Sequence, residues 1–243
     1  MMDRKYAIFG DIHANFEALT AVVEDARSKG VTDFVCVGDV VGYNASPSQC
    51  IKVIRDLGCV TVRGNHDHYC SYNESLDDFQ PLAASVIAWT RRQLTEEDGK
   101  WLRELPYQKA CGGFTLVHST LDMPERWGYV FDTLAAEANF SYQVTSLCFH
   151  GHTHVPMIYE KQREIMRIEP CKIKIAFGQK FFINVGSVGQ PRDSDPRSAY
   201  VLYSAKSKEL EFVRVRYDVD AAMEKNMKAG LPERLALRLA QGH

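Results

Sequence analysis

The sequence has no long apolar run, no strong net charge and no closely paired cysteines, and each absence excludes a class of protein. No segment approaches the ~20 consecutive apolar residues of a membrane-spanning helix, and the apolar run within MMDRKYAIFGDIH is too short for a signal peptide. The 29 Lys and Arg nearly balance the 31 Asp and Glu, which gives a net charge of −2. General nucleic-acid and membrane binders need a basic face, so we expect neither kind of partner.

The seven cysteines show no CxxC spacing. They are odd in number and scattered, and several lie in strand-like runs such as FVCVG and SLCFH. This usage favours buried free thiols in a reducing compartment, so we predict a cytoplasmic protein. The 45% hydrophobic and 25% charged residues are typical of a globular chain.

The first third of the chain alternates strand and helix patterns. Apolar strand patterns occupy 5–10, 33–38 and 59–64, and helical patterns that end at a glycine occupy 14–30 and 46–58. This rhythm predicts a parallel sheet with right-handed crossovers. In such sheets, functional sites form at the carboxyl ends of the strands.

The rest of the chain mixes helices with antiparallel strands. Helices are predicted within 69–106, where Thr95 and Asp98 form a capping box, and over 134–145. A hairpin is predicted around Gly112-Gly113, and further strands over 146–154, 156–161, 181–186, 198–204 and 209–217, followed by two short helices split at 230–232. Because no repeat, linker or low-complexity segment interrupts the chain, we expect one domain over 1–243 with a helical insertion at about 69–106.

Five short motifs place metal-ligand residue types directly after predicted strands. They are GDIH with Asp11 and His13, GDVVG with Asp39, GNHDH with Asn65 and His66, the strand end at His118, and GHTH with His152 and His154. Each motif alone has an ordinary structural explanation, such as a helix N-cap, a turn or a surface loop. All five together, each at a strand end, predict that these side chains meet at one edge of the fold.

Crowded carboxylates repel one another and shift their pKa values, and two divalent cations resolve that conflict. Mixed nitrogen and oxygen ligands without thiolate suit manganese, iron, zinc or similar ions. Asp39 is the natural bridge because a carboxylate has two oxygens for two ions. One ion would then take Asp11, His13, Asp39 and His154, and the other Asp39, Asn65, His118 and His152.

These motifs resemble those of the calcineurin-like metallophosphoesterase superfamily, and the resemblance runs from residue 5 to about 197. The segment INVGSVGQPRD is similar to the NPGSVGQPR segment of the small bacterial and archaeal, phosphodiesterase-like branch, with Val185 in place of the proline. The resemblance implies a four-layer α/β/β/α sandwich of two mixed β-sheets flanked by helices, with a two-metal site. It also places His66 at the position of the superfamily's catalytic histidine.

One motif departs from the superfamily's protein phosphatases, which read GDxVDRG where this chain has GDVVGYN. The aspartate that orients the catalytic histidine there is Gly42 here, and the arginine that grips phosphate is Tyr43. A protein-phosphatase activity is therefore not expected, and another group must orient His66. Asp67, its sequence neighbour, is one candidate.

The resemblance implies a phosphohydrolase that cleaves phosphomonoester or phosphodiester bonds. A hydroxide bridging two cations ~3.5–4 Å apart would attack phosphorus, and His66 would protonate the leaving alkoxide. The expected cofactor is two divalent metal ions, with manganese preferred and iron, zinc or nickel as alternatives. The expected partner is a small phosphate-ester substrate, while the substrate's identity and the oligomeric state stay open.

Two other functions compete with this interpretation. A nuclease or a dinucleoside-polyphosphate hydrolase would use the same metal chemistry, although a nuclease should show a basic groove that the charge balance does not suggest. A catalytically inactive protein-binding scaffold would keep the fold and lose ligands or the catalytic histidine. This chain retains all of them, which argues against a scaffold.

Several further residues have two interpretations each. Asn15 would contact phosphate or cap a helix, and Arg192 would bind a substrate phosphate or form a surface salt bridge. Asn184 would hydrogen-bond a ligand histidine, whereas His68 and His150 are expected to be structural. The insertion at 69–106 would be a substrate lid or a packing element, and its aromatic residues would stack on a nucleobase or fill a core; they are Tyr69, Tyr72, Phe79 and Trp89.

Overall fold

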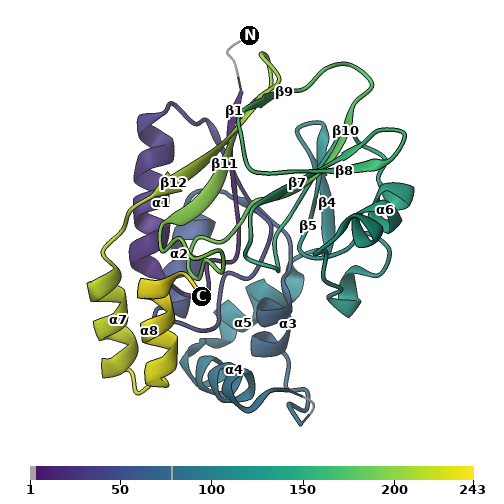
Figure 1. The fold of residues 1–243 in the computed structure, drawn as a ribbon. Coiled ribbons are helices and arrows are strands. Elements are labelled where there is room, and N and C mark those ends of the chain that lie inside the picture. The colour runs from purple at the N-terminus through teal and green to yellow at the C-terminus, as the bar shows by residue number, and fades with distance from the viewer. Residues whose placement is uncertain (1–3, 78) are drawn as a thin grey trace.

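The computed structural model describes residues 4–77 and 79–243, in which two six-stranded sheets lie face to face between helices (Figure 1). The first sheet has the order β3-β2-β1-β11-β12-β9 and the second the order β4-β5-β6-β10-β7-β8. The strands of the first sheet are β1 (Lys5–Phe9), β2 (Asp33–Cys36), β3 (Val60–Thr61), β9 (Ile173–Lys174), β11 (Ser198–Ser204) and β12 (Glu209–Val215). Those of the second are β4 (Gln108–Cys111), β5 (Phe114–Val117), β6 (Leu147–His150), β7 (Met157–Lys161), β8 (Ile165–Ile168) and β10 (Lys180–Asn184).

Each sheet contains three parallel neighbours that point their carboxyl ends the same way. In the first sheet, β1, β2 and β3 are parallel and are joined by the crossover helices α1 (Phe16–Ser28) and α2 (Pro47–Asp56). In the second sheet, β5, β6 and β10 are parallel. The predicted β4–β5 and β11–β12 hairpins are both present and antiparallel. Both sheets are therefore mixed, as expected.

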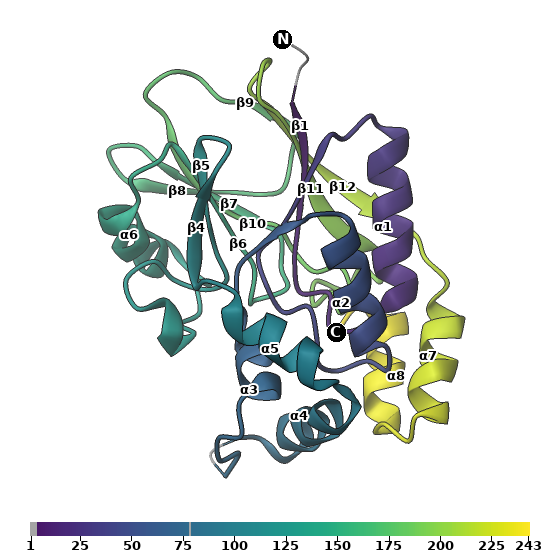
Figure 2. The same ribbon diagram turned by 180° about the vertical axis from the view of Figure 1, so that it is seen from behind.

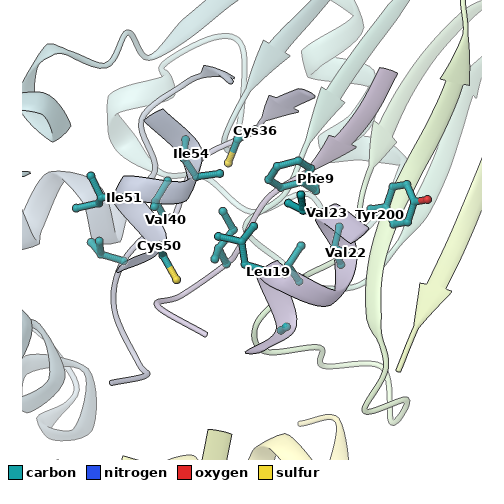
Figure 3. Packing of buried hydrophobic residues seen from close by; sticks show 14 of the residues in the cluster. Phe9, Leu19, Val22, Val23, Cys36, Val40, Cys50, Ile51, Ile54 and Tyr200 are labelled. Carbon is teal, nitrogen blue, oxygen red and sulfur yellow. The ribbon is translucent and has the colours of Figure 1, made fainter. Parts of the chain in front are cut away.

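Strand alternation divides the apolar side chains among three cores, which separate four layers. Along β1, Ala7 and Phe9 pack beneath α1 and α2, whereas Tyr6 and Ile8 face the second sheet. Figure 3 shows side chains of α1 and α2 gathered around Phe9 in the first of these cores. On the far side, helix α6 (Thr133–Tyr142) covers the second sheet. The predicted four-layer α/β/β/α sandwich is confirmed.

Three helices stand between β3 and β4, and two more end the chain (Figure 2). The first three are α3 (Asn65–Ser71), α4 (Pro81–Gln93) and α5 (Glu96–Glu104), and the last two are α7 (Val219–Lys228) and α8 (Glu233–Gln241). The capping box predicted at the start of α5 is present, since Asp98 N–H donates to Thr95 Oγ1 at 3.1 Å and Thr95 N–H donates to the Asp98 carboxylate at 3.1 Å. No helix in the described ranges has both the length and the apolar character needed to cross a membrane.

Candidate metal centre

The five ligand motifs meet at the carboxyl ends of the parallel strands. Asp11 and His13 follow β1, Asp39 follows β2, and Asn65 begins α3 just after β3. His118 follows β5, while His152 and His154 follow β6 in the other sheet. The site is thus built from both sheets, at the edge where their parallel strands end.

Four of these side chains converge as a first group. Asp11, His13, Asp39 and His154 each offer one ligand atom, and these atoms all lie within 4.8 Å of one another. His154 Nε2 is 3.3 Å from Asp11 Oδ1 and 3.0 Å from His13 Nε2, and His13 Nε2 is 3.5 Å from Asp39 Oδ2. This is the set that the sequence assigned to one cation.

A second group shares Asp39 with the first. Ligand atoms of Asp39, His118 and His152 also lie within 4.8 Å of one another, and Asn65 Oδ1 is 3.1 Å from His118 Nε2. Asp39 Oδ2 is 3.4 Å from His118 Nε2, so this one oxygen faces both groups. Asp39 Oδ1 instead accepts the backbone N–H of His66 at 2.8 Å. The shared ligand atom is therefore one oxygen, where the sequence argument assigned one oxygen to each ion.

Backbone carbonyls fix the tautomer of all four imidazoles. His13 Nδ1 donates to Val41 O at 3.2 Å, His118 Nδ1 to Val37 O at 2.9 Å and His154 Nδ1 to Gln190 O at 2.6 Å. In His152 the roles of the nitrogens are exchanged, and Nε2 donates to Trp127 O at 2.9 Å. Each ring consequently turns its other nitrogen toward the centre, as metal-bound histidines do when a neighbouring acceptor takes their first N–H.

The facing ring nitrogens are close enough to share one positive charge, carried by a proton or by a cation. His13 Nε2 and His154 Nε2 are 3.0 Å apart, and His118 Nε2 and His152 Nδ1 are 3.2 Å apart. Two nitrogens bound to one ion at about 2.1 Å, at right angles, lie about 3.0 Å apart. The spacing of the imidazole pairs therefore fits a shared cation, and the donor set of nitrogen and oxygen atoms fits the same conclusion.

Burial sets the charge states of this cluster. The six histidine and aspartate side chains of the two groups are at most 5% exposed. Burial lowers the pKa of His152 to about 3 and lowers those of His13 and His154 as well, so these rings are neutral lone-pair donors at pH 7. For His118, burial also acts to lower the pKa, but the facing Asp39 carboxylate outweighs it and raises the pKa to about 9. The Asp39 carboxylate therefore favours a positive charge, carried by a proton or a cation, in the space beside it.

The loops that carry these ligands hold unusual backbone conformations. Five of the proposed ligands have positive φ: Asp11 (48°), His13 (48°), Asp39 (54°), His152 (70°) and His154 (62°). Non-glycine residues adopt this region rarely, and its cost is commonly found at functional sites. Five of the ten non-glycine residues with positive φ among the described residues are thus proposed to bind metal.

His66 lies beside the ligands in the first turn of α3. Its ring centroid is 4.8 Å from that of His13 and 4.4 Å from that of Tyr43. Burial lowers its pKa to about 4, and its Nδ1 is buried without a hydrogen-bond partner. Gly42, at φ 95°, makes room for this ring, because a Cβ there would overlap the Nδ1 atom of His66.

Asp67 does not orient the imidazole of His66, in contrast to the role considered from the sequence. Its carboxylate accepts four backbone N–H groups, from Asp39 and Val40 at 2.8 Å, Gly64 at 3.0 Å and Val41 at 3.2 Å. Neighbouring residues on a helix point in different directions, so Asp67 turns toward the loop that carries Asp39. It shapes that loop instead.

Asn184 also contacts backbone where a ligand histidine was expected. Its Nδ2 donates to Gly151 O at 2.7 Å and to Thr153 Oγ1 at 2.9 Å, and its closest histidine atom is His150 Nδ1 at 3.4 Å. His150 belongs to neither ligand group and stacks on Phe182 at the end of β6. Asn184 therefore braces the loop that holds His152 and His154 without touching either ring.

Asn15 adopts the helix-capping alternative. Its side chain accepts the N–H of Ala18 at 3.1 Å as the N-cap of α1, and its Nδ2 donates to Gly189 O at 3.0 Å. Both functional groups of Asn15 are engaged and the residue is buried. A contact with substrate phosphate is therefore not assigned to it.

Arg192 faces the ligand cluster and has no salt bridge within the described residues. Its Nη2 donates to Tyr43 Oη at 3.4 Å and to Gln190 Oε1 at 3.3 Å, and the guanidinium carbon lies 5.8 Å from the Tyr43 ring centroid. Burial raises the pKa of Asp11 to about 7, and the charge of Arg192 partly opposes this rise; for His66, the charge of Arg192 adds to the lowering of the pKa by burial. His68, by contrast, pairs with Glu74 at 3.1 Å.

A cavity of about 790 Å³ opens onto the site, and Asn65, His66, Tyr129 and Arg192 line part of it. Residues 79–83 of the helical insertion also line it. Among the insertion's aromatic residues, Phe79 packs on Tyr69 with ring centroids 4.7 Å apart. Trp89 donates to Ala229 O at 3.2 Å and so ties α4 to the C-terminal helices.

Outside the insertion, five residues of this cavity were not predicted from the sequence as possible substrate contacts: Tyr43, Tyr129, Arg234, Arg238 and His243. Tyr129 stacks on His152 with a centroid distance of 4.1 Å. Arg234 and Arg238 are four residues apart on α8, far from every motif in the sequence. Their spacing in an amphipathic helix was the available signal, although it does not specify what they face.

Comparisons with known proteins agree with this architecture. The description "Calcineurin-like phosphoesterase superfamily domain" matches residues 5–208. An uncharacterized protein of Methanocaldococcus jannaschii is 38% identical over 246 residues, which span 100% of both chains. The crystal structure of a metallophosphoesterase from Sphaerobacter thermophilus has a TM-score of 0.89 at 36% identity, again over 100% of both chains.

One similar protein carries a specific activity in its name. A symmetrical bis(5'-nucleosyl)-tetraphosphatase of Aromatoleum aromaticum is 31% identical over 127 residues, which are 48% of this chain and 44% of that protein. The shared part is less than half of each chain. The residues matched by the family description include all five ligand motifs but end before α7 and α8.

Proposed function

This chain belongs to the calcineurin-like phosphoesterase superfamily, and from that premise we propose that it hydrolyses phosphomonoester or phosphodiester bonds with two divalent cations. Asp11, His13, Asp39 and His154 would hold one cation, and Asp39, Asn65, His118 and His152 the other. We propose manganese as the resident metal, because nitrogen and oxygen donors without thiolate suit it. The unpaired cysteines support a reducing compartment such as the cytoplasm.

One observation carries the proposal: four buried imidazoles turn a ring nitrogen toward two points that share Asp39 Oδ2. Such an arrangement costs free energy in an empty site, because the neutral rings of His13 and His154 face one another and two aspartates are buried. Two cations satisfy every one of these atoms.

Divalent cations bound there would generate hydroxide from water near neutral pH and neutralise the phosphoryl oxygens. Side chains and backbone carbonyls of the protein are proposed to hold the ligands in place. Asp67 holds the loop of Asp39 in shape, and the carbonyls of Val37, Val41 and Gln190 hold the ligand rings. These contacts fix the site before substrate arrives, which lowers the cost of reorganisation during the reaction.

His66 is proposed to protonate the leaving oxygen. It lines the cavity next to the ligands but belongs to neither ligand group. In the free protein its low pKa keeps the ring neutral at pH 7, and a bound phosphate would raise that pKa because an adjacent negative charge favours the imidazolium. Arg192 is proposed to bind a phosphoryl oxygen, and its place over Tyr43 supplies the positive charge that residue 43 lacks.

The experiment that tests this function compares His66→Gln with the control His68→Gln on metal-loaded protein. For esters with poor leaving groups, kcat of His66→Gln should fall about 10²–10⁴-fold, with a much smaller fall for p-nitrophenyl phosphate. Metal content measured by mass spectrometry should stay at the wild-type value. A loss of metal together with activity, or equal losses on both kinds of ester, would refute the role of His66.

A dinucleoside-polyphosphate hydrolase is the second candidate. Three arginines in the cavity favour it, because such a substrate has several phosphate groups. A panel with p-nitrophenyl phosphate, its bis ester, a 2′,3′-cyclic nucleotide and diadenosine tetraphosphate separates the candidates by kcat/KM. A fully metallated protein that is inert toward every ester would instead support the inactive scaffold.

A further inference from the structure

The wall of the cavity next to the metal centre is formed by arginines without acidic partners. Arg192, Arg234 and Arg238 all line it. Elsewhere, five arginines pair with carboxylates, while others, such as Arg27 and Arg163, are also without a salt bridge among the described residues but line no shared cavity with a second arginine; the paired ones are Arg4, Arg55, Arg167, Arg197 and Arg214. In the described ranges, no carboxylate lies within 4.0 Å of the guanidinium groups of the three cavity arginines. Their positive charge is therefore available to bind an anion that enters the cavity.

Helix α8 holds two of these arginines in fixed positions. Residues four apart on a helix lie on one face, with Cβ atoms about 5–6 Å apart, so Arg234 and Arg238 point to the same side. A neighbouring face of α8 is anchored, because Leu235 packs with Val86 of α4 in an apolar cluster. Figure 1 shows α8 at the same end of the molecule as α3 and α4.

The C-terminal end of α8 is tied to the loop of Arg192. Ser194 N–H donates to Gly242 O at 2.9 Å, and a Cβ at Gly242 would lie 2.7 Å from backbone atoms of Asp195. Gly242 has φ 68°, as a helix C-cap requires. The loop 192–195 and α8 thus form one wall, in which the three arginines are placed by packing and by backbone hydrogen bonds.

The three guanidinium groups repel one another electrostatically. Burial lowers the pKa of Arg238, and the charges of Arg234 and Arg192 lower it further. Arg192 lines the same cavity as Asn65 and His66, so the three arginines and the edge of the ligand cluster face one space. A string of like charges is unfavourable alone, and an anion with several oxygens relieves it.

We propose that Arg234 and Arg238, together with Arg192, bind a second phosphate group of the substrate while a first phosphate group lies at the metal centre. The inference rests on the proposed function and names its substrate class: compounds with at least two phosphate groups. The cavity volume of about 790 Å³ is typical of sites for whole small molecules. Arg234 and Arg238 on α8 lie beyond residues 5–208, which the family description matches, whereas Arg192 lies within them.

A binding experiment on metal-free protein tests the arginines without any catalysis. Inorganic triphosphate and orthophosphate are titrated by calorimetry into wild type, the double variant Arg234→Gln/Arg238→Gln, and the control Arg27→Gln/Arg163→Gln. The control removes the same charge from exposed positions outside the cavity lining. We expect triphosphate to bind at least tenfold more weakly to the α8 variant than to wild type or the control. Affinities of wild type and the α8 variant within twofold of each other would overturn the proposal.

A kinetic experiment on metal-loaded protein distinguishes the two sources of a second phosphate. The substrates share one nucleoside: adenosine 5′-monophosphate, adenosine 5′-triphosphate for a phosphate chain, and adenosine 3′,5′-bisphosphate for a separate second ester. Wild type should favour one of the last two over the monophosphate in kcat/KM. That ratio should fall at least tenfold in the α8 variant and recover in part in Arg234→Lys/Arg238→Lys.

The outcomes separate this proposal from the proposed function. If no ester is hydrolysed but the α8 variant loses triphosphate affinity, the arginine site stands and the phosphoesterase function fails. If hydrolysis is present and the ratio between substrates is the same in wild type and the α8 variant, the arginine site fails and the function stands. Thermal unfolding of all variants checks that the substituted surface residues leave the fold intact.

Discussion

Replacing Asp67 with alanine is predicted to destabilise the metal-free protein more than any ordinary surface or helix-capping change. The Asp67 carboxylate is fully buried and accepts the backbone N–H groups of Asp39, Val40, Val41 and Gly64. No other acceptor is available to these four donors among the hydrogen bonds of the described residues. Alanine therefore leaves four buried N–H groups without a partner.

The magnitude follows from the four bonds. A buried donor that loses its acceptor costs about 1–3 kcal/mol, so four set an upper range of about 4–12 kcal/mol. Water that enters the vacated space offsets part of this cost. We expect a loss of about 3–5 kcal/mol in the free energy of unfolding, near the lower end of this range. Asp67→Asn should also destabilise, because its amide group would face N–H donors.

The assay is equilibrium urea unfolding in EDTA, which removes the contribution of metal binding to stability. Asp98→Ala is the matched control, since Asp98 is also a nearly buried helix-capping aspartate but accepts only from Ser48 Oγ and Thr95 N–H. The control should lose about 1 kcal/mol. An Asp67→Ala protein within 1 kcal/mol of wild type would show that the carboxylate does not hold this loop.

Three further predictions concern metal content, the cavity and the thiols. Asp39→Ala should lose both metals, whereas His154→Ala should lose one, since Asp39 belongs to both ligand groups and His154 only to the first. Inductively coupled plasma mass spectrometry gives the number of metal ions per protein. Equal numbers in the two variants would contradict the role of Asp39 as a ligand shared by both ions. Gly42→Ala should lower kcat at least tenfold with metal content unchanged, because the Cβ of the alanine displaces His66. The positive φ at position 42 should also cost about 1–2 kcal/mol of stability in this variant. A kcat equal to that of wild type would disprove the prediction. Ellman's reagent at pH 8 should label the exposed Cys171 fast, and all seven cysteines only after denaturation; several fast thiols in the native protein would contradict the described burial.

The sequence predicts the fold best where local patterns and packing agree. Along 5–58, apolar periodicity, glycine stops and Pro47 all mark elements that the structure contains. Strands β8 and β9 were not predicted, since they are short and partly exposed and have no clear alternation. Helix α3 was also missed, because its residues were interpreted only as ligands after a strand. Such elements are fixed by pairing with neighbours, which a single sequence does not show.

The ligand positions were predictable because each follows a strand, and strand ends in one sheet converge. The groups that support them were not. Asp67 and Asn184 are polar residues close to ligands in sequence, but their side chains bond to backbone groups. The tautomers of the imidazoles depend on carbonyls of Val37 and Gln190, which no residue type can reveal. Likewise, the helical pattern of α8 marks its buried face and says nothing about what Arg234 and Arg238 face.

The departures at residues 42 and 43 and the arginine wall belong to one physical change. Gly42 admits the His66 ring into space that a side chain would fill, and the Tyr43 ring lies 4.4 Å from it. No cation is then left on this loop, and the positive charge comes from Arg192, whose guanidinium lies over Tyr43. Arg192 is continuous with the α8 arginines through the bond of Ser194 to Gly242. If the arginines bind phosphate as proposed, this positive charge lies farther out along the cavity than residue 43, and we expect an extended substrate with several phosphates to be preferred over a single phosphorylated side chain.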